Sequence, residues 1–207
     1  MVRLKNICFS YKSFETGTHE PKLECVFGDF SMELREGEAL AVMGESGSGK
    51  TTLVKLLLGL IEPDSGTVEG LEGKRVSVVF QEDRLLPWYS AKENIALVMR
   101  DTDKKERDKN ALELLSEMEL VEAADKPIRE LSGGMQRRVS IARALAFGGD
   151  IIILDEPLKG LDAELKKRIA ARIKAHFNTI LLITHDEDEA GLFGCERVIS
   201  ASKFRAI

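Results

Sequence analysis

The sequence lacks a hydrophobic run long enough to cross a membrane. The longest candidate, residues 53–61, contains the charged Lys55, whereas a spanning helix needs about 20 apolar residues. The first residues also lack the apolar centre of a secretory signal. We therefore expect that the chain does not enter a membrane by itself, although it could dock on a protein that does.

Cysteine is scarce, which limits the chemistry that the chain can perform with sulfur. The three cysteines, Cys8, Cys25 and Cys195, are widely spaced and form no Cys-x-x-Cys pair. This pattern argues against a disulfide framework and against a cysteine-held metal. We expect small, buried, apolar side chains in a reducing cytosol.

An excess of positive charge is also lacking. The formal net charge is −5, and because nucleic-acid partners usually leave a basic footprint, we expect no nucleic acid as the main partner. The chain has 207 residues, of which 43% are hydrophobic. This is enough for one compact domain and too little for two full ones.

Apolar patterning predicts an α/β fold. The first 35 residues alternate between apolar and polar side chains, as antiparallel strands do, around a loop at 12–21. Uninterrupted apolar runs at 151–155 and 179–184 indicate strands covered on both faces. Because strands and helices alternate there, we expect a parallel sheet. Further predicted strands span 38–44, 73–81 and 197–200, further helices span 50–61, 163–177 and 186–194, and a turn spans 62–66.

A mostly helical segment interrupts this pattern. Helical spacing with charged outer faces recurs from about 85 to 146, and we interpret the charged run at 101–109 as a solvated helix start. We therefore predict one domain over 1–207. Its core, with an N-terminal antiparallel β subdomain, spans about 1–84 and 147–207, and an α-helical subdomain is inserted at about 85–146.

A glycine-rich turn separates the predicted strand at 38–44 from the helix that follows. Residues 44–51 match the pattern GxxxxGK[ST] in the strand–loop–helix context that phosphate binding requires. Backbone N–H groups of such a loop converge on phosphate oxygens at the positive end of the helix dipole. An ordinary glycine turn is the alternative. The expected binding residues are Gly44, Glu45, Ser46, Gly47, Ser48, Gly49, Lys50, Thr51 and Thr52, with the Lys50 charge on the β- and γ-phosphates and the Thr51 hydroxyl on Mg²⁺.

Two carboxylates lie at the end of the apolar strand at 151–155. Asp155 and Glu156 would emerge at the carboxyl edge of the sheet, where α/β folds bind ligands. We expect Asp155 to hold Mg²⁺ and Glu156 to orient or deprotonate the attacking water. Taken in isolation, a solvated acidic strand end is the common alternative.

Two other predicted strands end in polar side chains. His185 follows the strand at 179–184 and could hydrogen-bond the γ-phosphate, with a structural histidine as the alternative. Gln81 ends the strand at 73–81. Its amide could contact Mg²⁺ or water, or it could be polar surface.

A second helix start has the same anion-receptive character. Ser132 is a suitable N-cap for the predicted helix at 137–147, and Gly133 and Gly134 leave the backbone N–H groups open. This helix start has no phosphate-binding loop of its own before it. It is either a plain capped helix or a contact for a nucleotide held by another copy.

The order of these motifs resembles that of ATP-binding-cassette (ABC) ATPases over nearly the whole chain. The resemblance implies a P-loop NTPase fold, with ATP and Mg²⁺ as ligands. It implies a head-to-tail homodimer in which each ATP lies between one phosphate loop and the opposite 132–134 segment. It implies catalytic roles for Lys50, Gln81, Glu156 and His185, and an adenine-stacking aromatic that Tyr11 matches best and Phe9 second.

One segment departs from that family. Many members have a small Ser-Ala pair where Lys159 and Gly160 stand, in a loop that communicates between the two sites. Leu161 and Asp162 match the family. The contacts made by the preceding pair therefore need to be found from the structure.

Residues 81–88, QEDRLLPW, resemble importer ATPases of the nitrate, sulfonate and taurine type. The resemblance implies integral membrane permease subunits as partners, a solute-binding protein in the full system, and a cytoplasmic location at the inner face of the cell membrane. Leu85, Leu86, Pro87 and Trp88 are candidate permease contacts, or an apolar cluster that closes the loop. The chain ends soon after 197–200, so we expect no further C-terminal domain.

Two other functions fit part of the pattern. An ABC ATPase that acts on DNA would need a long coiled coil between the two halves of the cassette, and the segment 51–154 is too short to contain one. ABC ATPases that act on ribosomes usually carry two cassettes, whereas this chain has one. A P-loop kinase would not need the helix start that residues 131–136 form, LSGGMQ, or a second copy. ATP hydrolysis without an acceptor would discriminate between these functions.

Overall fold

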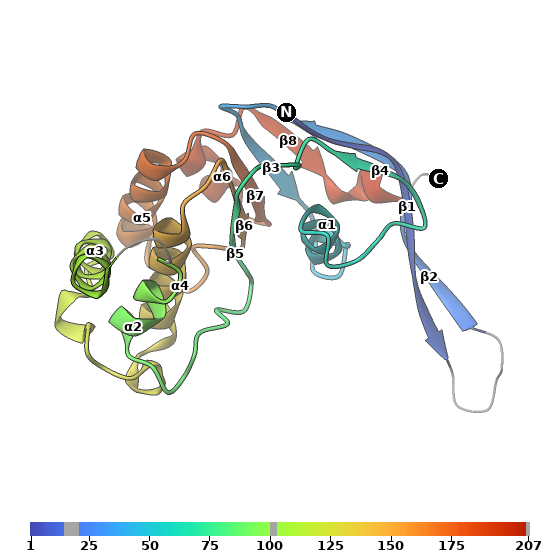
Figure 1. The fold of residues 1–207 in the computed structure, drawn as a ribbon. Helices are drawn as coiled ribbons and strands as arrows, with labels where there is room; N and C mark the ends of the chain where they lie inside the picture. Colours follow the sequence, from blue (N-terminus) through green and yellow to red (C-terminus); the bar gives the residue numbers. More distant parts are fainter. Residues whose placement is uncertain (15–20, 100–102, 206–207) are drawn as a thin grey trace.

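The computed structural model describes residues 1–14, 21–99 and 103–205. Within them, a parallel sheet with strand order β5-β6-β7-β3-β8 stands beside an antiparallel sheet with order β2-β1-β4 (Figure 1). The parallel strands are β3 (Ala39–Met43), β5 (Val76–Val79), β6 (Ile151–Asp155), β7 (Ile180–Thr184) and β8 (Arg197–Ser200), and the antiparallel strands are β1 (Val2–Phe14), β2 (Pro21–Leu34) and β4 (Ser65–Glu69).

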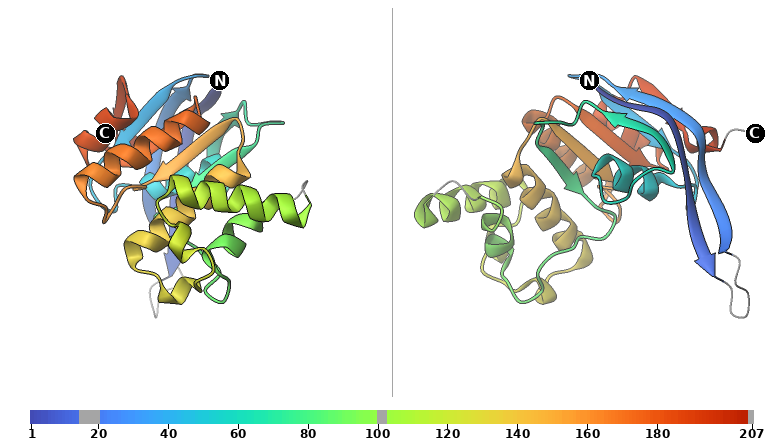
Figure 2. Two further views of the ribbon diagram at one scale, coloured as in Figure 1. Left: turned by 90° about the vertical axis from the view of Figure 1, so that its left-hand side faces the viewer. Right: turned by 45° about the vertical axis from the view of Figure 1, so that its right-hand side comes forward.

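The helices fall into separate groups around these sheets. Helices α2, α3 and α4 gather on one side of the parallel sheet, and the β1–β2 hairpin extends away on the other (Figure 2). The helices are α1 (Lys50–Leu57), α2 (Ala91–Ala96), α3 (Lys104–Glu117), α4 (Gly133–Phe147), α5 (Ala163–His176) and α6 (Glu187–Phe193), with short 3-10 turns at Val121–Ala123, Ile128–Glu130 and Ala201–Phe204. The proposed boundaries of a core and a helical subdomain stay a prediction.

Alternate side chains of the parallel strands enter two hydrophobic clusters. Ile151 and Ile153 of β6 pack in the cluster that contains α1 and the antiparallel sheet. Ile152 and Leu154 pack in the cluster that contains α4, α5 and α6. Every residue of β6 and β7 is buried, which is why their sequences read as unbroken apolar runs.

The register of the parallel sheet brings its functional strand ends together. Leu154 of β6 pairs with Val79 of β5 and with Leu182 of β7, and Thr184 of β7 pairs with Met43 of β3. The carboxyl ends of β3, β6 and β7 therefore lie at one edge of the sheet. The loops that leave this edge carry the phosphate-loop pattern, the two carboxylates and His185.

Several predicted boundaries were wrong. The loop at 12–21 is strand up to Phe14 and again from Pro21, and residues 15–20 lie outside the described residues. The turn at 62–66 runs into β4, which was not predicted. The strand at 73–81 is reduced to β5, and the helical segment from 85 has its first helix only at Ala91. The charged run at 101–109 does start a helix, capped by Asp103, although residues 101 and 102 lie outside the described part.

Helix α1 also ends earlier than predicted. The predicted helix continued to residue 61, but Gly59 adopts φ 64°. The N–H groups of Gly59 and Leu60 donate to the carbonyls of Leu56 and Lys55 (3.1 and 2.9 Å). This is a glycine-terminated helix end, and Gly59 was its overlooked signal.

The burial of the three cysteines also differs from the prediction. Cys25 is exposed, and Cys8 and Cys195 are half-buried, so the prediction of three buried side chains was wrong. Burial does raise the pKa of the Cys195 thiol to about 11.

None of the helices in the described ranges is both long enough and apolar enough to span a membrane.

Candidate active site

The phosphate-loop residues form a tight turn between β3 and α1. Gly47 and Gly49 adopt φ 79° and 98°, a region that favours glycine. A Cβ atom on Gly49 would lie 2.5 Å from Cγ1 of Val26, so no other residue fits there without rearrangement. The glycines that the sequence pattern contains are therefore required by the shape of the loop.

Lys50 stands at the first position of α1 and points back into this loop. Only 7% of the residue is exposed, and its Nζ donates to the carbonyl oxygens of Gly44 and Glu45, both at 2.7 Å. The hydroxyl oxygen of Ser48 is buried without a hydrogen-bond partner among the described residues. Because buried polar atoms are normally paired, an unpaired hydroxyl inside this loop fits a site built for a polar ligand.

Thr51 and Asp155 meet across the edge of the sheet. The Thr51 hydroxyl donates to Oδ2 of Asp155 at 3.3 Å, and Asp155 is 2% exposed. Burial raises the pKa of the Asp155 carboxyl, and the neighbouring charge of Glu156 adds to this, while the hydrogen bond from Thr51 opposes it. A hydroxyl and a buried carboxyl side by side are oxygen donors that suit Mg²⁺, which takes few protein ligands and completes its shell with phosphates and water.

Glu156 lies next to this pair in a left-handed backbone conformation, with φ 49°. Its N–H donates to the carbonyl of Ile183 at 2.8 Å, which ties the turn to β7. Its Oε1 lies 3.3 Å from Nδ1 of His185, and its Oε2 lies 3.1 Å from Nζ of Lys159. Burial pushes the pKa of Glu156 upward, but Lys159 and His185 outweigh it, so that this pKa lies below its ordinary value.

Lys159 thus has a contact that the sequence did not predict. Its side chain is 62% exposed, and its N–H also donates to the carbonyl of Glu156 at 3.3 Å. The position where many family members have a small residue therefore supplies a cation to the candidate base. The available signal was a lysine three residues after a carboxylate, which is common on any polar loop.

Tyr11 lies at the outer wall of the same site. Its hydroxyl lies 3.3 Å from Oγ1 of Thr52, and Nζ of Lys55 lies 6.0 Å from the centre of its ring. Phe9, the second candidate, is 8% exposed and packs edge-on against Tyr11 at 4.9 Å. Tyr11, which is 37% exposed, and not Phe9 therefore lines the hollow of the site.

A hollow of about 260 Å³ unites most of the predicted site residues. His185 is outside its wall and reaches it through Glu156. Gly44, Glu45 and Ser48 line an adjoining hollow. Arg205, Glu24 and Val26 complete the walls without any signal in the sequence. The predicted residues in the wall are Tyr11, Ser46, Gly47, Gly49, Lys50, Thr51, Thr52, Gln81, Asp155 and Glu156.

The second helix start lies outside this hollow. Ser132 caps α4, and its hydroxyl accepts a hydrogen bond from the N–H of Met135 at 3.3 Å, as predicted. A Cβ atom on Gly133 would meet no atom within 4 Å, and one on Gly134 would meet Leu161 of the loop after Glu156 at 3.5 Å. The open N-terminus of α4 therefore does not contribute to the phosphate site of its own chain.

Arg137 is a site residue that sequence reasoning missed. It lies one turn into α4 and donates to the carbonyl oxygens of Asp155 and Glu156 at 2.7 and 2.6 Å. Arg137 stands four residues before Ile141 and so shares one face of a helix with an apolar residue, which was the only available signal in the sequence. An arginine in a helix is normally solvent-exposed, so this signal was weak.

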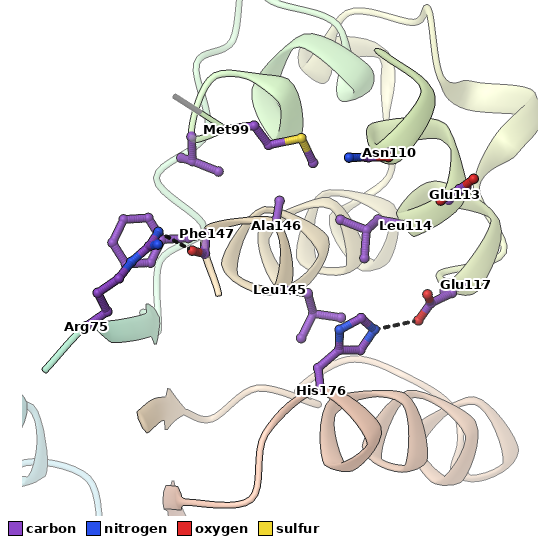
Figure 3. Close-up of a pocket in the computed structure, with 11 residues that line it drawn as sticks. Arg75, Met99, Asn110, Glu113, Leu114, Glu117, Leu145, Ala146, Phe147 and His176 are labelled. Carbon is purple, nitrogen blue, oxygen red and sulfur yellow. Dashed lines mark hydrogen bonds and ion pairs between the residues drawn. The ribbon is translucent and has the colours of Figure 1, made fainter. Parts of the chain in front are cut away.

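A larger hollow, of about 600 Å³, lies away from these residues, between α3, α4 and α5 (Figure 3). Leu114 and Leu145 form its apolar floor, and the ion pair of Glu117 with His176 (3.0 Å) joins α3 to α5 at its edge. None of the predicted site residues lines it. Size alone therefore does not identify the active site of this chain.

Comparison with known proteins finds relatives over most of the chain. The family model described as ABC transporter matches residues 27–159. The taurine import ATP-binding protein TauB of Roseobacter denitrificans is 39% identical over 188 residues, which cover 84% of this chain and 70% of that protein. The bicarbonate transport ATP-binding protein CmpD of Synechococcus elongatus is 39% identical over 192 residues, which cover 84% and 67%.

Solved structures give the same result for the fold. The dimeric ATP-binding cassette MJ0796, in a post-hydrolysis state with ADP and Pi, superposes with a TM-score of 0.85 at 31% identity, covering 97% of this chain and 94% of that one. The α/β fold with an antiparallel patch and added helices is thereby confirmed. The chain belongs to the ABC transporter family and is one of its ATP-hydrolysing cassettes.

Proposed function

We propose that two copies of this chain bind and hydrolyse ATP between them and thereby drive a membrane importer. The observation that carries the proposal is the convergence of Lys50, Thr51, Asp155 and Glu156 on one hollow at the carboxyl edge of the sheet. These groups supply phosphate binding, a magnesium site and a base, which are the parts that phosphoryl transfer to water requires.

The chemical step rests on the loop and on the two carboxylates. Lys50 turns from the loop carbonyls to the phosphates, and the backbone N–H groups of the loop bind their oxygens. Thr51, Asp155 and the amide of Gln81 would hold Mg²⁺, which when bound neutralises charge on the β- and γ-phosphates. Glu156 orients water and accepts its proton.

Glu156 must free one carboxylate oxygen to accept that proton. In the structure both oxygens have partners, His185 and Lys159. The side chains of Lys159 and His185 are equally exposed, at 62% and 63%, so either contact costs little to break. We propose that Lys159 gives way, because His185 is the partner expected to contact the γ-phosphate and can orient the carboxylate at the same time.

The second copy completes each site. The N-terminus of α4, with Ser132, Gly133 and Gly134, is open and anion-receptive but does not line the phosphate hollow of its own chain. Placed against the ATP of another copy, it would add N–H donors to the γ-phosphate. The dimeric state of the MJ0796 cassette supports a homodimer of this kind.

The transport partner would be a membrane permease that contacts residues 85–88. Trp88 is 71% exposed, whereas Leu85 packs against the larger core cluster. The buried Asn94 fixes the loop between them through the N–H and carbonyl of Leu86 (2.8 and 3.1 Å). A rigid loop therefore presents Trp88 outward, and we assign the contact to Trp88 and the closing of the loop to Leu85.

The proposed location follows from that partner: the inner face of the cell membrane, with a solute-binding protein in the complete system. The relatives do not identify the cargo. Proteins named for taurine, bicarbonate and aliphatic sulfonates match this chain at 39% to 41% identity. Similarity of the cassette therefore does not distinguish between such solutes, and the permease and the solute-binding protein would select one.

Replacing the exposed tryptophan tests the transport part of the proposal. A Trp88→Asp chain is expected to lose most of its association with the membrane fraction of its own cells, because a charge replaces the apolar contact, while its ATPase rate in solution stays unchanged. The control is Leu60→Asp, since Leu60 is 59% exposed on the turn after α1. Membrane association that survives Trp88→Asp, or is lost equally in Leu60→Asp, would rule out this contact.

A further inference from the structure

The guanidinium group of Arg137 reaches the turn that carries the candidate base. Arg137 is 5% exposed. Its Nη2 donates to the carbonyls of Asp155 and Glu156 at 2.7 and 2.6 Å, and its Nε donates to the carbonyl of Pro157 at 2.9 Å. The backbone on both sides of the Glu156 side chain is therefore held by one cation.

The same guanidinium holds the segment that leaves β5. Its Nη1 donates to the carbonyl of Phe80 at 2.6 Å and to Oδ1 of Asp83 at 2.9 Å. A second arginine of α4, Arg143, donates to the carbonyls of Asp83 and Arg84, both at 2.8 Å. Residues 80–84 are thus fixed to α4, and this segment continues into the loop that presents Trp88.

The planar shape of arginine makes this double contact possible. A guanidinium has five N–H donors in a rigid fork, whereas a lysine ammonium is a single point of charge on a flexible stem. One side chain therefore binds two backbone segments that are far apart in the sequence. Neither segment can shift relative to the other without breaking buried, charge-assisted hydrogen bonds.

We propose that Arg137 is a positioning residue for ATP hydrolysis, which keeps the Glu156 turn in register with residues 80–84. This inference rests on the proposed role of Glu156 as the base. If a membrane partner displaces the segment near Trp88, the side chain of Arg137 transmits this displacement to the Glu156 turn. Arg137 does not itself line the substrate hollow, but it donates to the carbonyls of three residues that do, Gln81, Asp155 and Glu156.

The test is Arg137→Lys, measured as steady-state ATP hydrolysis by the purified full chain. The kcat is expected to fall at least about tenfold with the KM for ATP within about twofold, because a misplaced base slows the reaction without weakening substrate binding. In single-turnover measurements, Arg137→Lys added to Glu156→Gln is expected to slow hydrolysis by no more than about a further twofold, because both changes act through one carboxylate. Arg137→Met, checked by urea unfolding, should lower kcat further, and the lysine variant decides the test if the methionine variant does not fold.

Arg75 provides a matched control. Its Nη2 donates to the carbonyl of Phe147 at the end of α4 (2.7 Å), so Arg75→Lys changes a bond of the same kind away from both ATP-contacting segments, and its kcat should stay within about twofold of wild type. A wild-type kcat in Arg137→Lys, a KM that rises as much as kcat falls, or an undiminished effect in the Glu156→Gln background would overturn the inference. A Glu156→Gln protein of normal rate would instead contradict the proposed base.

Discussion

A Glu156→Gln protein is expected to bind ATP with near wild-type affinity and to hydrolyse it about 10²- to 10⁴-fold more slowly, the usual range for loss of a general base. The amide has nearly the shape of the carboxylate but does not accept a proton from water. The side chain is 13% exposed and lies beside the loop rather than within it, so phosphate binding should persist. Phosphate release and equilibrium ATP binding would measure the two parts separately.

The state of association gives a second measurement on the same protein. We expect ATP to close the dimer and hydrolysis to release it, so Glu156→Gln should accumulate as an ATP-bound dimer in sedimentation. Glu164→Gln, in the first turn of α5 with its side chain 72% exposed, is the control and should behave as wild type. A wild-type rate of phosphate release in Glu156→Gln would show that another group is the base.

Lys50→Ala is expected to lose tight ATP binding altogether. A charge-assisted hydrogen bond contributes about 1.5–3 kcal/mol, which corresponds to roughly a tenfold to hundredfold loss of affinity. The loss should exceed this because Lys50 also bridges the carbonyls of Gly44 and Glu45, so that the loop loses its internal support as well as its cation. Calorimetric titration with Mg-ATP measures the change.

A lysine outside the site provides the control, because it tests whether loss of any positive charge weakens ATP binding or only loss of the charge at Lys50. Lys167 of α5 pairs with Glu164 on the surface, and Lys167→Ala should bind ATP as wild type does. Retained micromolar affinity in Lys50→Ala would show that the loop binds ATP without this side chain, contrary to the proposed phosphate site.

The parts of the fold that the sequence revealed are those with a local physical cause. Buried parallel strands require apolar side chains at every position, so β6 and β7 could be read directly from the sequence. The phosphate loop requires glycine where φ is positive, as at Gly49. The family resemblance then predicted ATP as the ligand and a second copy as the partner.

The features that could not be predicted from the sequence depend on contacts with residues distant in the chain. Strand β4 has no alternating apolar face and exists because it pairs with β1, with Val68 opposite Leu4. Lys159 and Arg137 look like ordinary charged residues until folding brings them to Glu156. Sequence reasoning therefore proposed the candidate reacting groups, and the structure was needed to show which side chains hold them.

The most direct test of the shared site uses two variants that are inactive for different reasons. Glu156→Gln lacks the base but keeps an intact α4 start. Gly133→Asp places a negative charge at that start, where the structure leaves room for a side chain, and so would repel the phosphate of the opposite copy. Each variant alone should hydrolyse ATP slowly.

Mixed before ATP is added, the two variants would form dimers with one complete site, made of the base and phosphate loop of Gly133→Asp and the α4 start of Glu156→Gln. We expect a rate of phosphate release well above the sum of the two separate rates. A mixture that releases phosphate only at that sum would contradict a site shared between two copies.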